Sequence, residues 1–156
     1  GHVDIIRRAN SIFDKVIVAV FHNPNKNPLF TMEERVEMLE EVVAEYEHVE
    51  VDGFSGLLTD YIEEHKGEVI IRGLRAVSDF ESEFQMALTN KKLAPDVETL
   101  FMMTNTQYAY LSSSTVKEVA SFGGCIEELV PPSVIEKLFK KLEEKDKMVD
   151  DNDESS

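Results

Sequence analysis

A few cationic side chains stand beside glycines, prolines and serines, in surroundings where a phosphate group could bind. Lys26 lies in a loop with two prolines, and Arg72 and Arg75 enclose a glycine–leucine pair. Further along the chain, a run of serines at 112–114 comes before a helical pattern. The first turn of a helix has N–H groups without intrahelical partners, and these attract anions. Cations together with such N–H groups are suited to binding a polyanion.

Each of these residues also has an ordinary structural role open to it. A lysine in a polar loop can simply be solvated, and the two arginines can form surface ion pairs of small energetic value with nearby acids (Asp79, Glu81 or Glu83). Gly73 can serve either a close approach of the backbone to a ligand or a turn. The serines can serve only as N-caps. Their joint occurrence on one predicted rim favours phosphate binding.

The remaining reactive side chains give weaker signals. His2 could donate to a phosphate held at the start of the first helical pattern, or it could be a frayed terminal residue. The sequence has no cluster with the ligand spacing of a protein-built metal site. It also has no Walker loop, GxGxxG motif or nucleophile elbow. Cys125 lacks a histidine partner in the sequence, so nucleophilic catalysis is not predicted.

The elements that must position these residues alternate between strands and helices. Continuous apolar or β-branched runs predict four strands, at 16–20, 49–51, 68–73 and 99–103. Helical spacing and capping signals predict helices from Val3 to Phe13, after Thr31, over 57–66, from Asp79 to about Lys92, from Ser112 to Phe122 and after Pro132. This order predicts an α/β fold with a parallel, doubly wound sheet and right-handed crossovers. Ligands of such sheets bind beyond the carboxyl ends of the strands, where the cations fall.

Composition fits one soluble globular domain. The 156 residues are 42% hydrophobic and 30% charged. The formal net charge of −15 disfavours binding to duplex DNA, and no apolar window is long enough for a transmembrane helix. One cysteine suits a reducing compartment, so a cytoplasmic protein is expected. We expect a folded domain over 1–143 and an acidic, disordered tail over 144–156.

Several segments closely resemble bacterial phosphopantetheine adenylyltransferases. The resemblance runs from residue 1 to about residue 142, and its most specific stretches are RGLRAVSDFE and SSSTVKEVA. The matching segments are 1–9, 24–39, 52–58, 71–87, 90–95, 110–120 and 129–134. The resemblance implies a Rossmann-like nucleotidyltransferase fold.

The resemblance also implies an activity. Members of the family reversibly transfer the adenylyl group of ATP to 4′-phosphopantetheine, with Mg²⁺, making dephospho-CoA and pyrophosphate in coenzyme A biosynthesis. They are cytoplasmic homohexamers, and neither a nucleic acid nor a membrane partner is implied. The acceptor phosphate attacks the α-phosphate of ATP in line, so the protein works by positioning and charge stabilisation.

The matched positions imply roles for individual residues. His2 would stabilise the α-phosphate in the transition state. Lys26 and Arg72 would hold the phosphate of phosphopantetheine, and Leu58 would line the pantetheine arm. The ATP-binding set would comprise His2, Gly73, Leu74, Arg75 and Glu83. The loop that holds adenine and the β- and γ-phosphates would comprise Tyr108, Ala109, Tyr110, Leu111, Ser112, Ser113 and Ser114.

The sequence departs from the family pattern before Gly1. Family members begin with a strand at the centre of the sheet and a loop that supplies a threonine to both substrates. We therefore expect the given sequence to be an N-terminal truncation that is unstable and inactive alone, with unpaired backbone on the strands at 16–20 and 68–71. Two other interpretations remain open: a cytidylyltransferase of the same superfamily, and a nucleotide-sensing module without activity.

Overall fold

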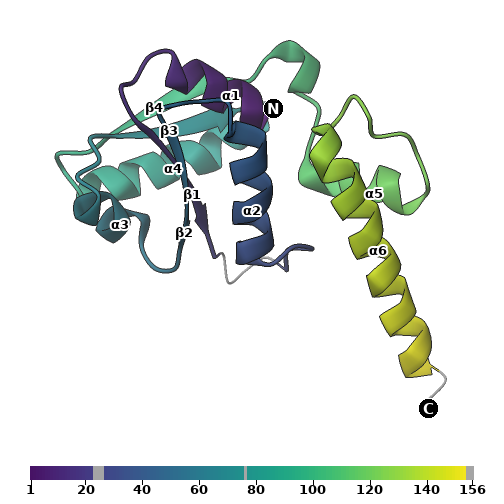
Figure 1. Ribbon diagram of the computed structural model, residues 1–156. Helices are drawn as coiled ribbons and strands as arrows, with labels where there is room; N and C mark the ends of the chain where they lie inside the picture. Colours follow the sequence, from purple (N-terminus) through teal and green to yellow (C-terminus); the bar gives the residue numbers. More distant parts are fainter. Residues whose placement is uncertain (23–26, 76, 154–156) are drawn as a thin grey trace.

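The predicted order of elements is confirmed by the computed structural model, which describes residues 1–22, 27–75 and 77–153 (Figure 1). A first helix is followed by four strand–helix units and a closing helix. The elements are α1 (His2–Asn10), β1 (Val16–Phe21), α2 (Met32–Val43), β2 (Val49–Phe54), α3 (Leu58–Glu64), β3 (Val69–Leu74), α4 (Val77–Leu93), β4 (Glu98–Met103), the 3₁₀ turn η1 (Thr106–Tyr108), α5 (Ser113–Ser121) and α6 (Pro132–Asp153).

The strands pair in parallel, which confirms the α/β class. β1 pairs with β2, with Val16 opposite Val49, and β3 pairs with β4, with Val69 opposite Glu98. Within the described ranges, β1 and β3 each have a strand on one side only, so the strands form two separate pairs. Helix α1 contacts both β1 and β3.

The capping box predicted for α2 is present. The Thr31 hydroxyl accepts a hydrogen bond from the Glu34 N–H at 3.2 Å, and the Glu34 carboxylate accepts one from the Thr31 N–H at 2.8 Å. Together these bonds satisfy two N–H groups at the helix start. Met38 and Val43 are the buried residues of this helix. Tyr46, which lies beyond the end of the helix, donates its N–H to the Val43 carbonyl at 2.9 Å.

Two hydrophobic clusters of buried residues are found within the described ranges. One comprises Ile62, Ile70, Ala94 and Val97, with Leu58 packed against it. The other joins α5 and α6 through Val116, Ala120, Ile126 and Leu138. The first cluster packs β3 against α3 and the end of α4, so it stabilises the strand that carries Arg72.

Three predicted boundaries are wrong. Helix α1 ends at Asn10 rather than Phe13, because the Ile12 and Phe13 N–H groups both turn back to the Ala9 carbonyl. Strand β2 continues to Phe54, in register with the end of β1. Helix α4 begins at Val77, so Asp79 lies inside the helix and is not its cap.

Helix α6 continues through Asp153. Glutamate and lysine are strong helix formers, and Glu143 and Lys147 have the favourable i,i+4 spacing. The first half of α6 is held to α2 by ion pairs from Lys137 to Glu41 and from Lys141 to Glu34. Its far end extends away from the strands (Figure 1). Among the helices of the described ranges, none is both long enough and apolar enough to span a membrane.

Candidate active site

Three of the predicted site residues lie near one another at the start of α1 and the end of β3. The pKa of His2 is lowered from its ordinary value, first because surrounding protein atoms desolvate the ring, and then because of neighbouring cations that include Arg75 and Arg72. Part of the His2 side chain nevertheless stays open to solvent. An imidazole flanked by two guanidinium groups on an accessible rim is well placed to meet a phosphate chain.

Arg72 is held in place by Glu83. Its Nε donates to Oε2 of Glu83 at 2.7 Å and its Nη2 donates to Oε1 at 2.7 Å. The glutamate is only 18% exposed, and its hydrogen bonds raise the pKa of Arg72. This two-pronged pairing fixes the plane of the guanidinium and leaves further N–H groups for a ligand. Glu83 therefore contacts a site arginine, although sequence resemblance placed it among the ATP-binding residues.

Arg75 reaches the loop after β4. Its Nη1 donates to the Leu111 carbonyl at 3.1 Å. This bond joins the end of β3 to the segment at 108–114, which sequence resemblance assigned to adenine and the β- and γ-phosphates. The two arginines thus have different neighbours, an α4 carboxylate for Arg72 and the loop for Arg75.

The loop itself is ordered by local hydrogen bonds. The Asn105 side chain accepts from the Gln107 N–H at 3.2 Å and starts η1. The Leu111 N–H then donates to the Tyr108 carbonyl at 3.0 Å. Ala109 is half-buried, whereas Tyr110 is 70% exposed and could stack on a planar ligand.

The serine run begins helix α5 as predicted. Ser112 is the N-cap, and its hydroxyl accepts from the Thr115 N–H at 3.0 Å. Ser113 and Ser114 form the exposed first turn, where N–H groups have no intrahelical partner. Ser112 therefore has the N-capping role that the sequence left open. The first turn of α5 can still attract an anion.

Gly73 has a packing role rather than a turn. A Cβ atom there would lie 3.3 Å from Cγ1 of Ile5 and 3.8 Å from Oγ1 of Thr104. The glycine lies within β3 and lets α1 approach the strand closely. Leu74, the next residue, is buried, so only its backbone could face a nucleotide; its carbonyl accepts from the Thr104 N–H at 2.9 Å.

Leu58 is not brought to this rim by the described contacts. Leu58 is the first residue of α3 and packs against the cluster of Ile62 and Ile70. Lys26 lies outside the described residues. A cavity of about 410 Å³ between α2, β2 and α3 is lined by residues such as Asp52, Tyr61 and His65 and by none of the predicted site residues.

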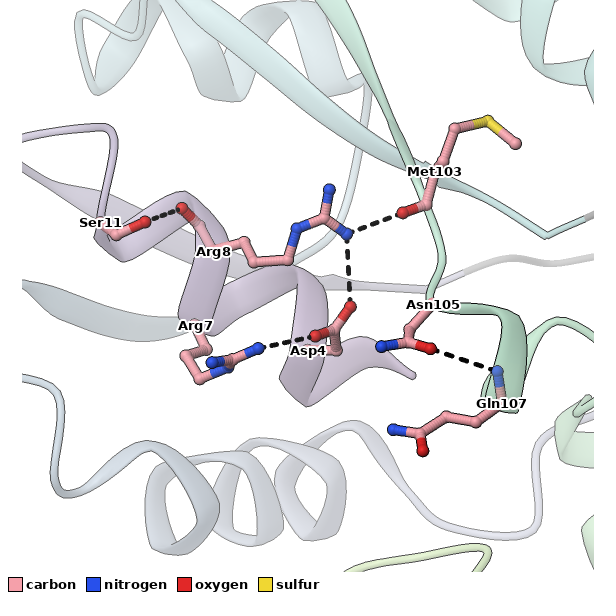
Figure 2. Close-up of polar contacts among 7 residues, drawn as sticks. All are labelled: Asp4, Arg7, Arg8, Ser11, Met103, Asn105 and Gln107. Carbon is pink, nitrogen blue, oxygen red and sulfur yellow. Dashed lines mark hydrogen bonds and ion pairs between the residues drawn. The ribbon is translucent and has the colours of Figure 1, made fainter.

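Sequence reasoning missed a polar cluster that links α1 to the end of β4 (Figure 2). Asp4 and Arg8 of α1 contact each other, and Arg8 also contacts the Met103 carbonyl at the end of β4. The i,i+4 spacing of an acid and a base was a signal for the first contact. The contact of Arg8 with the Met103 carbonyl links positions 95 residues apart, so no local sequence pattern predicts it.

The family model for cytidylyltransferase-like proteins matches residues 1–119. Together with the parallel α/β fold, this match defines the class of the protein as a nucleotidyltransferase of the cytidylyltransferase-like type.

Curated relatives narrow the class. The phosphopantetheine adenylyltransferases of Natranaerobius thermophilus and Alkaliphilus metalliredigens are each 60% identical over 141 residues, which cover 90% of this chain and 87% and 90% of the relatives. That of Clostridium tetani is 59% identical over 145 residues, 93% of this chain and 91% of the relative. The chain belongs to the phosphopantetheine adenylyltransferase family.

Proposed function

We propose that the protein transfers the adenylyl group of ATP to the phosphate of 4′-phosphopantetheine, reversibly, giving dephospho-CoA and pyrophosphate in coenzyme A biosynthesis. The observation that carries this proposal is the convergence of His2, Arg72 and Arg75 on one rim. The chain that carries these residues is 60% identical to two phosphopantetheine adenylyltransferases. The contacts of the two arginines then suggest a division of the rim between two substrates.

ATP, the donor of the adenylyl group, would bind on the side of the rim where Arg75 lies. Its bond to the Leu111 carbonyl brings a cation beside the ordered loop and the first turn of α5. Tyr110 offers a surface for a base, and the N–H groups of Ser113 and Ser114 offer donors for phosphates. ATP would therefore lie along residues 108–114, with its triphosphate between the start of α5 and Arg75.

4′-Phosphopantetheine, the acceptor of the adenylyl group, would bind on the side of the rim where Arg72 lies. The guanidinium is oriented by Glu83, so its remaining N–H groups point in a fixed direction. A phosphate monoester held there would keep an oxygen close to the nucleotide. Lys26, which precedes α2 in the sequence, would add a second cation to the same phosphate.

His2 lies where the two substrates would meet. In the reaction, an oxygen of the acceptor phosphate forms a bond to the α-phosphorus of ATP. The bond from that phosphorus to the bridging oxygen breaks, and pyrophosphate leaves with the electron pair. Negative charge on the α-phosphate oxygens would be met by the N–H of His2, with the neighbouring guanidinium groups adding positive charge.

Mg²⁺ is proposed to accompany ATP. Within the described ranges there is no group of three or more His, Cys, Asp or Glu side chains that could hold a metal ion. We propose that the ion is bound chiefly by the phosphates of ATP and by water, as is usual for Mg²⁺ with nucleotides.

The protein is further proposed to act as a cytoplasmic homohexamer, as the family resemblance implies. Phe80, Phe84 and Leu88 support this assembly, because they are exposed on α4 at a four-residue spacing and would be covered by another subunit. Sedimentation should give the mass of six chains of 17.7 kDa. A mass of one chain at micromolar concentration would contradict the assembly.

The activity is tested by following pyrophosphate release. Release should require both ATP and 4′-phosphopantetheine, and CTP should replace ATP poorly. Preference for CTP would favour the cytidylyltransferase interpretation. Binding of ATP without any release in the presence of both substrates would favour a nucleotide-sensing module.

A further inference from the structure

Asp4 is a buried carboxylate in the first turn of α1. It is 8% exposed, and it accepts hydrogen bonds from Nη2 of Arg7 at 3.0 Å and Nη1 of Arg8 at 3.3 Å (Figure 2). The bond from Arg7, followed by the contacts of Arg8, lowers the pKa of Asp4, so the carboxylate is ionised at neutral pH. A buried charge is retained at a cost unless it is paired, so this cluster calls for a role.

Arg8 extends the cluster from α1 to β4. The same Nη1 that contacts Asp4 donates to the Met103 carbonyl at 2.7 Å. Met103 is the last residue of β4, and the next N–H, that of Thr104, is bonded to the Leu74 carbonyl at the end of β3. One guanidinium therefore ties α1 to the place where two strands end.

The end of β4 is also where the loop that leads to the proposed ATP-binding residues 108–114 begins. Asn105 starts the 3₁₀ turn η1. Gly1, at the start of α1, lies close to this turn. A Cβ atom on Gly1 would be 3.5 Å from Cβ of Tyr108 and 3.8 Å from Cγ2 of Thr104. The start of α1, which carries His2, is thus set against this loop, and Arg8 anchors the same helix two turns further along.

Arg7 provides an internal comparison. It shares the Asp4 carboxylate with Arg8, but its side chain is 62% exposed, against 38% for Arg8, and its hydrogen bond stays within α1. If the cluster served only to neutralise Asp4, the two arginines would be equivalent. Of the two arginines, Arg8 is the one whose described hydrogen bonds link α1 to the end of β4.

We propose that Arg8 and Asp4 are positioning residues for adenylyl transfer: Arg8 fixes α1 on the end of β4, and Asp4 fixes the Arg8 guanidinium. This inference rests on the proposed function. The His2 ring then stays aligned with a nucleotide held by residues 108–114. Displacing a group that stabilises a transition state by about 1 Å costs on the order of 10²-fold in rate, so such an anchor has a measurable effect on catalysis.

The test compares Arg8→Met with Arg7→Met. Each variant removes one positive charge and one hydrogen bond to Asp4, and methionine retains an apolar stem. We expect Arg8→Met to lower kcat by roughly 10- to 100-fold. Its KM values for ATP and phosphopantetheine should stay within about threefold of the original, because the anchor touches neither substrate. Arg7→Met should retain kcat within about twofold. Arg8→Lys, which keeps a charged donor, should recover part of the loss.

A titration of His2 by NMR supplies a readout that loss of stability would not move. The His2 signal is assigned by its disappearance in His2→Gln. In the original protein the pKa lies below its ordinary value, because of burial and then of cations that include Arg75, just after β3, and Arg72 on β3. In Arg8→Met the pKa should rise toward the ordinary value as the helix leaves the two arginines, whereas in Arg7→Met it should not change.

The outcomes separate the alternatives. An unchanged kcat in Arg8→Met, or equal losses in both variants, would overturn the positioning role. If Arg8→Met melts below the assay temperature, Asp4→Asn tests the same link with a side chain of the same shape, and a several-fold loss of kcat at unchanged KM is expected. If the original protein makes no dephospho-CoA, the proposed function fails, and the His2 titrations still decide whether Arg8 fixes α1.

Discussion

His2→Ala is expected to lower kcat by roughly 10²–10³-fold, which is the usual effect of removing one hydrogen-bond donor to a transition state. The affinity for ATP should change much less, because the bond to the α-phosphate becomes strong only as charge develops there. The control is His48→Ala, which removes an exposed histidine immediately before β2. A large loss of ATP affinity with unchanged kcat would show that His2 binds the ground state.

The protonation of His2 gives a second check on its role. Its pKa lies below the ordinary value of 6.5, so protonation favours the unfolded chain. The stability that this histidine contributes is complete above about pH 6.5 and declines as the pH falls further. Bound ATP brings negative charge, so it should raise the pKa of His2. A titration that is identical with and without ATP would place His2 away from the phosphates.

Arg72→Ala is expected to weaken phosphopantetheine binding by roughly ten- to hundred-fold, because a charge-assisted hydrogen bond contributes about 1.5–3 kcal/mol. Its effect on ATP should be smaller, and Lys26→Ala should show the same preference. Arg75→Ala should act mainly on ATP, because Arg75 contacts the loop at Leu111. Lys15→Ala is the control, since this exposed lysine pairs with Glu50.

A variant of Glu83 gives a further test of the assignment of Arg72 to phosphopantetheine and of Arg75 to ATP. Glu83→Gln keeps the shape of the side chain but removes the charge that holds Arg72. It should therefore weaken phosphopantetheine more than ATP, as Arg72→Ala does. Calorimetric titration of each variant with each substrate measures the effects. Equal losses for both substrates in the Arg72 and Arg75 variants would refute the division, and a Glu83→Gln defect confined to ATP would return Glu83 to the donor side.

Much of the fold could be predicted because its signals are local. Apolar β-branched runs mark β1 and β3, the capping box marks α2, and the serines mark α5. The alternation of these elements was enough to predict parallel pairing. Arg72 and Arg75 could be placed on one rim because strands in such a fold end on the same side.

The parts that could not be predicted depend on tertiary contacts. Gly73 suggested a ligand or a turn, and only the position of Ile5 shows that a helix approaches there. The bond from Arg8 to the Met103 carbonyl joins distant segments through a backbone atom, for which side-chain types give no signal. Helix α6 extends past residue 143 because its charged residues are good helix formers, which acidic composition alone obscures.

The central claim is the transfer of an adenylyl group from ATP to 4′-phosphopantetheine, and it is tested most directly with ATP labelled at the α-phosphate. The label should appear in dephospho-CoA, only when phosphopantetheine is present, and in amounts equal to the pyrophosphate released. Because the reaction is reversible, adding pyrophosphate and dephospho-CoA should return label to ATP. Label that remains in AMP, or a phosphopantetheine product that instead carries the γ-phosphate, would contradict the proposed function.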